Sequence, residues 1–251
     1  MLIFDFDGVL INSLDEIVLT TYNATTDSLV TRLAEVPADL TRMFKNNRFH
    51  VQPIGDAMAL MHWCLAQRQQ DVEKILTPEE YLVITRLSDV DLTERTNRIY
   101  AARKRFMDRD IKRWFALHQT YQPLWDELIR HQNHPFVILT NKNHDATLRL
   151  CRHFGLDMDA EDIYSGDNGV TKIENMLRIR KRFGRQPFVF IDDSIKNLQE
   201  LDRHFNRDEK VLTLALAAWG YIGSGDTAAA PQSGYPTFQQ TDVVQFLNSS
   251  I

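Results

Sequence analysis

The sequence is poor in the features that mark secreted or membrane-spanning chains. Only two cysteines occur in 251 residues, and Cys64 and Cys151 match no metal-ligand or redox spacing. We expect two small buried thiols in a reducing compartment. The longest apolar stretch, residues 211–220, is too short to span a bilayer, and the apolar run at residues 1–4 is too short for a signal peptide. We therefore expect a cytoplasmic protein with no membrane partner.

The sequence also lacks an excess of positive charge. Its formal net charge is −5, so no global basic field attracts nucleic acid, which we do not expect as a partner, although a nucleotide substrate stays open. Apolar residues make up 43% and charged residues 25% of the chain, which is ordinary for a globular protein. A length of 251 residues fits one core domain with an insert.

Short apolar runs alternate with helix-like segments in the second half of the chain. After Leu2–Phe6, the first of these runs, we expect buried strands at Phe136–Leu139, Phe188–Ile191 and Val211–Ala217, with helices between them. Near-continuous apolar strands indicate burial on both faces. This β-α-β rhythm predicts an α/β fold with a doubly wound parallel sheet. The Gly-, Ala- and Ser-rich segment at 223–235 is expected to be a mobile surface loop.

The segment between the first and second strands has a different character. It contains no convincing strand pattern, and helix starts are marked by Thr77 followed by Pro78 and by Thr93 followed by Glu94. Helices are expected at 15–25, 37–44, 55–67, 78–87 and 93–117. We therefore predict two domains, an α/β core made of residues 1–12 and 120–251 and an all-helical domain made of residues 13–119.

Acidic and hydrogen-bonding residues follow three of the predicted strands. Asp5 and Asp7 end the first, residues 140–142 follow the second, and residues 192–194 follow the third. Helix caps and turns would explain each group taken singly. Asp5, however, interrupts an apolar strand, where an unpaired carboxylate is costly. Carboxylates that converge on one sheet edge repel one another, and hard oxygen ligands in that number suit Mg²⁺.

The same residues resemble the four signatures of the haloacid dehalogenase superfamily, whose members are mostly phosphatases. The run Asp5–Leu10 resembles the first signature, Ile138–Asn141 the second, Lys172 the third and Ile191–Ser194 the fourth. The stretch Trp219–Tyr221 is similar to one found in phosphoglycolate-phosphatase-like members. The resemblance implies a Rossmann-like core, and it implies that the helical insert is a cap of the C1 type.

The resemblance also implies that Asp5, Asp7 and Lys172 are catalytic and that Thr140, Asn141 and Lys172 bind phosphate. Asp5 would attack phosphorus and form an aspartyl-phosphate. Asp7 would protonate the leaving alcohol and later activate water. Thr140 and the backbone of Asn141 would hold phosphoryl oxygens, and Lys172 would neutralise their charge. The implied enzyme is a phosphoric monoester hydrolase whose substrate is a small phosphorylated metabolite.

The resemblance further implies a Mg²⁺ site. Asp5, the backbone carbonyl of Asp7, and Asp193 would bind the cation, and Asp192 would be a direct or a water-mediated ligand. The division of roles between Asp192 and Asp193 stays open, because Asp192 stands where many relatives carry glycine. Asn197 occupies the position of a later acid in the family.

Several alternatives stay open at this point. A dehalogenase is disfavoured because it needs neither Asp7 nor the acidic pair, but a β-phosphoglucomutase-like phosphomutase would keep all four signatures. A catalytically weak binding module of the same fold is a further alternative. The protein is expected to be a monomer or a homodimer. The stretch Arg42–Gln52 is a candidate substrate-facing region, with a solvated polar loop as the alternative. Most basic residues of 93–117 are expected on a solvated helix face.

Overall fold

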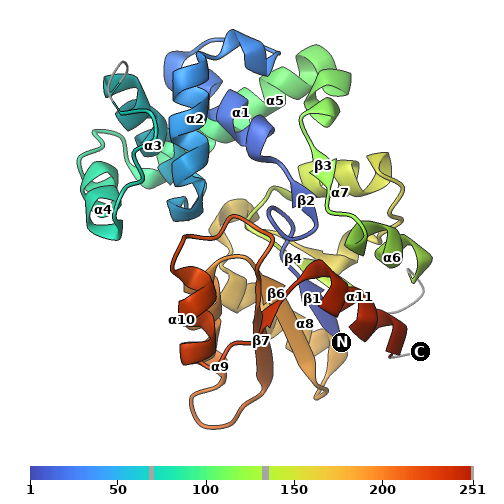
Figure 1. The fold of residues 1–251 in the computed structure, drawn as a ribbon. Helices are drawn as coiled ribbons and strands as arrows, with labels where there is room; N and C mark the ends of the chain where they lie inside the picture. The colour runs from blue at the N-terminus through green and yellow to red at the C-terminus, as the bar shows by residue number, and fades with distance from the viewer. Residues whose placement is uncertain (68–70, 132–135, 250–251) are drawn as a thin grey trace. The chain divides into compact units, whose positions relative to one another are not determined.

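The chain forms two compact units. The computed structural model describes residues 1–67, 71–131 and 136–249. One unit comprises Met1–Asn12 and Gln119–Ile251, and the other comprises Ser13–His118. Figure 1 shows that the first is built around a β-sheet and that the second is built of helices.

A parallel six-stranded sheet forms the centre of the first unit. In spatial order its strands are β5 (Ile163–Tyr164), β4 (Phe136–Leu139), β1 (Leu2–Phe4), β6 (Phe188–Asp192), β7 (Leu212–Ala217) and β8 (Thr237–Phe238). In the middle of the sheet Ile3 pairs with Val137 on one side and with Phe190 on the other. All residues of β1 and β4 are buried, because helices flank the sheet. The predicted α/β fold class is confirmed.

Helices connect these strands and supply the rest of the hydrophobic core. They are α6 (Leu124–Arg130), α7 (His144–His153), α8 (Lys172–Phe183), α9 (Ile195–Phe205), α10 (Asp226–Gln232) and α11 (Gln240–Ser249), with short 3₁₀ turns η3 (Ala160–Asp162) and η4 (Asp167–Gly169). Met176 of α8 and Leu198 of α9 pack with Phe190 in one buried cluster. Burying such side chains is the main stabilising contribution to a fold of this kind.

The segment at 223–235 is not the loop predicted from its composition. Residues Asp226–Gln232 form α10, and Ala230 is fully buried in the core cluster. Alanine has the highest helix propensity of all residues, and the three consecutive alanines at 228–230 outweigh the turn-forming glycines around them. Burial of Ala230 adds a tertiary contact that the composition does not reveal.

A two-stranded antiparallel ribbon lies where the chain leaves and re-enters the first unit. Strand β2 (Ile11–Asn12) pairs with β3 (Gln119–Thr120), and Ile11 lies opposite Thr120. The backbone N–H of Tyr121 also donates to the carbonyl of Leu10 at 3.1 Å. The two connections to the helical unit therefore leave the sheet unit side by side.

The second unit contains five α-helices and two 3₁₀ turns within its described residues. They are α1 (Leu14–Thr26), η1 (Leu33–Glu35), α2 (Ala38–Asn47), η2 (Arg48–His50), α3 (Asp56–Ala66), α4 (Pro78–Arg86) and α5 (Leu92–Ala116). Helix α4 begins with a capping box in which Thr77 and Glu80 exchange side-chain and backbone hydrogen bonds. Helix α5 is interrupted at Asp110, whose φ is −158°. The carboxylate of Asp110 accepts from the N–H of Arg113 at 3.0 Å and restarts the helix.

Two arginines of α5 are buried rather than solvated. Arg103 donates to Glu16 of α1 at 2.7 and 3.0 Å, and Arg95 donates to Asp56 of α3 at 2.9 Å. The expectation that most basic residues of 93–117 are solvated is confirmed, because the other basic residues of this range are exposed; Arg95 and Arg103 are the exceptions. Their long-range partners lie on other helices, and helical periodicity alone does not show such partners.

Two smaller expectations also have an outcome in the structure. Cys64 and Cys151 are both buried and free, as predicted. In the described part of the chain, no helix combines the length and the apolar character that crossing a bilayer requires.

Candidate active site

The first part of the site is the tight loop that follows β1. The N–H of Asp5 still pairs with the carbonyl of Ile191 at 2.9 Å, so the strand fixes the position of this residue. The carbonyl of Phe6 then accepts from the N–H groups of Leu10 and Ile11, both at 3.0 Å. Gly8 has a φ of +90°, a conformation that side-chain-bearing residues rarely adopt. These hydrogen bonds order the backbone that carries Asp5 and, two residues later, Asp7.

Lys172 connects two carboxylates of the site. Its ammonium lies 2.9 Å from Asp5 Oδ1 and 2.6 Å from Asp192 Oδ2. The three side chains are 6%, 10% and 0% exposed, respectively. Thr171 begins α8 as its N-cap, and its hydroxyl accepts from the N–H of Glu174. The helix therefore places Lys172 in its first turn, next to the ends of β1 and β6.

The electrostatics of this group follow from burial. Burial raises the pKa of Asp5 to about 7; the Lys172 ammonium opposes this effect, whereas the neighbouring carboxylates of Asp192 and Asp7 add to it. Burial works against the charge of Lys172, but Asp192 and Asp5 together raise its pKa above the ordinary value. Lys172 is therefore a permanent cation between two acids.

The carboxylate of Asp192 accepts hydrogen bonds at both of its oxygens. Its Oδ1 accepts from the N–H of Ser194 at 2.8 Å, and its Oδ2 accepts from Lys172 at 2.6 Å and from the side chain of Asn197 at 2.9 Å. Asn197 lies in α9, whose N-cap is Ser194. This arrangement holds Asp192 and Lys172 in one orientation.

Asp193 lies in a close-fitting cradle of glycine backbone. A Cβ atom on Gly8 would approach Asp193 Oδ2 to 1.9 Å, and one on Gly220 would approach Asp193 Cβ to 2.3 Å. The N–H of Tyr221 donates to Asp193 Oδ2 at 2.7 Å. The segment after β7 is itself tied to the first loop, because Trp219 Nε1 donates to the carbonyl of Val9 at 2.9 Å. The glycines leave just the space that the carboxylate occupies.

The end of β4 brings a second lysine to the site. Thr140 is 1% exposed, and its hydroxyl accepts from the N–H of Lys142 at 3.1 Å. Lys142 turns inward, and its ammonium lies 3.0 Å from Asp7 Oδ1. Its side chain is 1% exposed and that of Asp7 is 15% exposed. The side chain of Asn141 is exposed, while its backbone packs 3.2 Å from the position a Cβ on Gly166 would take.

Three carboxylates of the site are close enough to share a cation. Asp5, Asp192 and Asp193 each offer an oxygen within 4.8 Å of the others, and all three residues are buried. With Asp7, four carboxylates face two ammonium groups, those of Lys172 and Lys142. With all four acids ionised the remaining charge is −2, and this charge and the hard oxygen donors fit one divalent cation such as Mg²⁺. Asp7 contributes no side-chain oxygen to this group.

The sheet unit therefore contains every residue that was predicted to be catalytic, to bind phosphate or to bind the metal. Three further parts of the site had no predicted contact or catalytic role. They are Lys142, Asn197 and the stretch 219–221. Lys142 follows the second signature directly, and this position is the only signal that could have identified it. The donor from Tyr221 is a backbone group and carries no sequence signal of its own.

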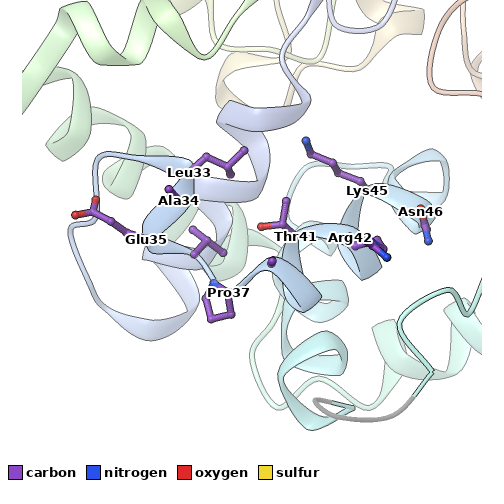
Figure 2. Close-up of a pocket in the computed structure, with 10 residues that line it drawn as sticks. Leu33, Ala34, Glu35, Pro37, Thr41, Arg42, Lys45 and Asn46 are labelled. Carbon is purple, nitrogen blue, oxygen red and sulfur yellow. The ribbon is translucent and has the colours of Figure 1, made fainter.

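The stretch Arg42–Gln52 belongs to the helical unit, and its polar side chains serve that unit's own packing. Arg42 pairs with Glu73 and Lys45 with Asp15. His50 is buried, and its Nε2 lies 2.8 Å from the carbonyl of Leu76. A surface pocket of about 760 Å³ lies between η1 and α2. Figure 2 shows Arg42 and Lys45 among the residues that line it. The exposed Arg42–Glu73 pair agrees with the alternative of a solvated polar region, although residues 42–50 lie in α2 and η2 and not in a loop.

Comparisons with known proteins agree with this geometry. The family model described as "Hydrolase: haloacid dehalogenase-like hydrolase" matches residues 1–203. The chain belongs to the haloacid dehalogenase-like hydrolases, a family of enzymes. No curated protein sequence matches the chain significantly.

Solved structures of low sequence identity share the fold over nearly their whole length. A haloacid dehalogenase-like family hydrolase from Streptococcus pneumoniae has 16% identity and a TM-score of 0.58, with 98% of this chain and 96% of that chain covered. A predicted phosphoglycolate phosphatase from Haemophilus somnus has 16% identity and a TM-score of 0.57, with the same coverage. A predicted phosphatase from Clostridium acetobutylicum has 12% identity and a TM-score of 0.58, with 99% and 97% covered.

Proposed function

We propose that this protein is a Mg²⁺-dependent phosphatase that hydrolyses a small phosphorylated metabolite through an aspartyl-phosphate on Asp5. The observation that carries the proposal is the buried group of Asp5, Asp192, Asp193 and Lys172 at the carboxyl edge of the sheet. A buried set of acids with excess negative charge serves no packing purpose. It suits a site that binds a divalent cation together with a phosphoryl group. Two of the similar solved structures carry phosphatase names.

Asp5 and Asp7 divide the covalent chemistry between them. A carboxylate oxygen of Asp5 attacks phosphorus, the ester P–O bond breaks, and Asp7 gives a proton to the departing alkoxide. In the second half-reaction Asp7 takes a proton from water as the water oxygen attacks phosphorus. The bond from phosphorus to Asp5 breaks, which releases inorganic phosphate and restores the carboxylate.

The surrounding residues neutralise and orient the phosphoryl oxygens. Lys172 offers a permanent positive charge beside Asp5, and the hydroxyl of Thr140 and the backbone of Asn141 are the proposed phosphoryl contacts. A bound Mg²⁺ supplies charge that allows an anionic nucleophile and an anionic substrate to approach each other. We assign Asp5, Asp193 and the backbone carbonyl of Asp7 as its protein ligands.

The donors around Asp192 support a distinct role for this residue. Its two oxygens already accept three hydrogen bonds, from Ser194, Lys172 and Asn197. We propose that Asp192 holds Lys172 in place and reaches the cation through water, while Asp193 binds the cation directly. The tight glycine cradle of Asp193 fits a ligand whose position must not vary.

We also propose that the helical unit, residues 13–119, is a cap of the C1 type on a core made of residues 1–12 and 120–251. The support is the β2–β3 ribbon, because both connections to the helical unit leave the core side by side. The first connection begins only a few residues after Asp7. A domain attached in this way can act as a lid that excludes water from the reaction.

The test is turnover of p-nitrophenyl phosphate with and without Mg²⁺, followed by a panel of phosphorylated metabolites. We expect metal-dependent phosphate release, and we expect Asp5→Asn to abolish it while the circular dichroism spectrum stays unchanged. Asp145→Asn, which alters an exposed acid of α7, is the matched control and should keep full activity. Normal turnover in Asp5→Asn, or no metal-dependent release from any substrate, would overturn the proposal.

The leaving group tests the role of Asp7 separately. Alkyl phosphates need a proton on the departing oxygen, whereas p-nitrophenolate leaves without one. Asp7→Asn should therefore slow alkyl phosphate hydrolysis more than p-nitrophenyl phosphate hydrolysis. An equal loss on both substrates would count against an acid role. A phosphomutase would instead interconvert sugar phosphates and hydrolyse them slowly.

A further inference from the structure

Exposed apolar side chains gather on and around α4 of the helical unit. Eight large hydrophobic residues are strongly exposed in the described chain, and five of them fall between residues 75 and 92. They are Ile75, Leu82, Val83, Leu87 and Leu92. Single exposed leucines are common on protein surfaces and need no explanation, whereas contiguous apolar patches mark interaction surfaces.

The exposed residues of α4 form one stripe along the helix. Glu79, Leu82, Val83 and Arg86 follow the spacing of one helical face, and all four are exposed. On the inner side, Tyr81 is only 5% exposed. Its ring stacks on His50 with a centroid distance of 4.8 Å. The helix therefore packs within its own unit through one face and leaves a second face, with an apolar centre, in solvent.

The stripe is complementary to itself in an antiparallel arrangement. Its acidic residue Glu79 lies in the first turn and its basic residue Arg86 in the last. A two-fold axis placed between Leu82 and Val83 brings Glu79 opposite Arg86 of the partner subunit and Leu82 opposite Val83 of the partner subunit. Neither Glu79 nor Arg86 has an ion-pair partner among the residues that the structure describes.

We propose that this chain forms a homodimer through the α4 stripe, with the two copies of α4 packed antiparallel. A parallel arrangement would place Glu79 against Glu79 and Arg86 against Arg86, which is unfavourable. The helix dipole explains an acid at the start and a base at the end of a helix, but it does not explain the exposed Leu82 and Val83 between them. Closed two-fold dimers are the commonest oligomers and use one self-complementary patch.

The small size of the patch favours a weak dimer. A helix of nine residues is about 14 Å long, and the flanking side chains of Ile75 and Leu87 extend the contact. Such a surface is at or below the low end of specific interfaces, about 1,200 Å² in total. We therefore expect a reversible dimer with a dissociation constant in the micromolar range, visible as a mass that depends on concentration.

Sedimentation velocity of the full chain over an about hundredfold concentration range tests the proposal. The mass should rise from the 29.2 kDa of one chain towards twice that value. Glu79→Arg and Arg86→Glu should each weaken the dimer about tenfold or more, because each places like charges opposite one another. The double variant carries both changes and should return the dissociation constant to within about threefold of the wild-type value.

Two features of this design separate the interface from effects on folding. The double variant opposes the dipole of α4 at both ends, so a damaged helix would leave it weaker than either single variant, not restored. Leu82→Lys should abolish dimerisation, whereas Leu177→Lys should not, although the two leucines are 47% and 48% exposed on helices of different units. A monomer at every concentration, or a dimer unaffected by Leu82→Lys, would overturn the proposal.

Discussion

The ammonium of Lys142 lies 3.0 Å from Oδ1 and 3.4 Å from Oδ2 of Asp7, a residue 135 positions earlier in the chain. The contact is almost inaccessible to solvent, because the lysine side chain is 1% exposed. A buried lysine is costly unless it is paired, so Asp7 and Lys142 stabilise each other. Asp7 is thereby held in one position beside Asp5.

Removing this ammonium tests whether it positions the proposed acid. Lys142→Met keeps most of the side-chain volume but removes the ammonium that holds Asp7 in position, so we expect the kcat for alkyl phosphates to fall about tenfold to a hundredfold. The loss on p-nitrophenyl phosphate should be smaller, because its leaving group needs no proton. Lys181→Met, on the exposed side of α8, is the control. Wild-type rates in Lys142→Met would contradict the positioning role.

The glycine cradle gives a test of the proposed metal ligand. In Gly220→Ala the new Cβ would lie 2.3 Å from Asp193 Cβ and 2.6 Å from the carbonyl oxygen of Gly8. The carboxylate must therefore shift, and we expect Mg²⁺ affinity, measured by calorimetry, to fall about tenfold or more. Gly225→Ala is the matched control, since a Cβ there meets no atom within 4 Å. Equal Mg²⁺ affinity in the two variants would argue against Asp193 as a ligand.

The pKa of Asp5 predicts how the stability of the metal-free protein depends on pH. Burial raises this pKa from 3.8 to about 7, so the folded state holds the proton more tightly than the unfolded state. The stabilisation is complete below the unfolded value and is lost as the pH rises through about 7. In EDTA, Asp5→Asn should therefore have a higher Tm than the wild type at about pH 8.

The difference in Tm between Asp5→Asn and the wild type should shrink as the pH falls towards about 4, where the wild-type carboxyl is protonated in the folded state. Differential scanning calorimetry across this pH range measures it. Asp145→Asn controls for the general effect of losing a carboxylate. A Tm difference that is independent of pH would show that Asp5 is not the titrating group.

The buried ion pair of the helical unit predicts a large effect on stability. Arg103→Met removes two charge-assisted hydrogen bonds to the buried Glu16 carboxylate, which also accepts from Thr20 at 2.7 Å and from Trp114 at 3.3 Å. An uncompensated buried charge destabilises a fold by about 3–5 kcal/mol, and we expect a loss of this size in urea unfolding. Adding Glu16→Gln to Arg103→Met should recover part of it, because the remaining buried charge is gone.

An exposed ion pair on the same helix is the control for this measurement. Arg98 and Glu94 lie 2.7 Å apart, with side chains about half exposed. Arg98→Met should change the free energy of unfolding by less than about 1 kcal/mol, because water screens and replaces the interaction. Comparable losses in Arg98→Met and Arg103→Met would show that burial does not govern the cost.

Local sequence patterns were sufficient for the strands and for the residues at their ends. The apolar runs of β1, β4, β6 and β7 predict buried strands because a strand buried on both faces tolerates few polar side chains. Asp5 stood out because it breaks such a run. The order of Asp5, Thr140, Lys172 and Asp192 along the chain then pointed to one sheet edge, since parallel strands end on the same side.

The tertiary structure alone decided the partners of these residues and the burial of charges. Lys142 facing Asp7, Arg103 facing Glu16, and the backbone of Tyr221 facing Asp193 join segments that lie far apart in the sequence. A sequence pattern reports the local periodicity of burial, whereas such contacts depend on how whole elements pack. For the same reason α10 was missed, because its helix is fixed by the packing of Ala230 as well as by local propensity.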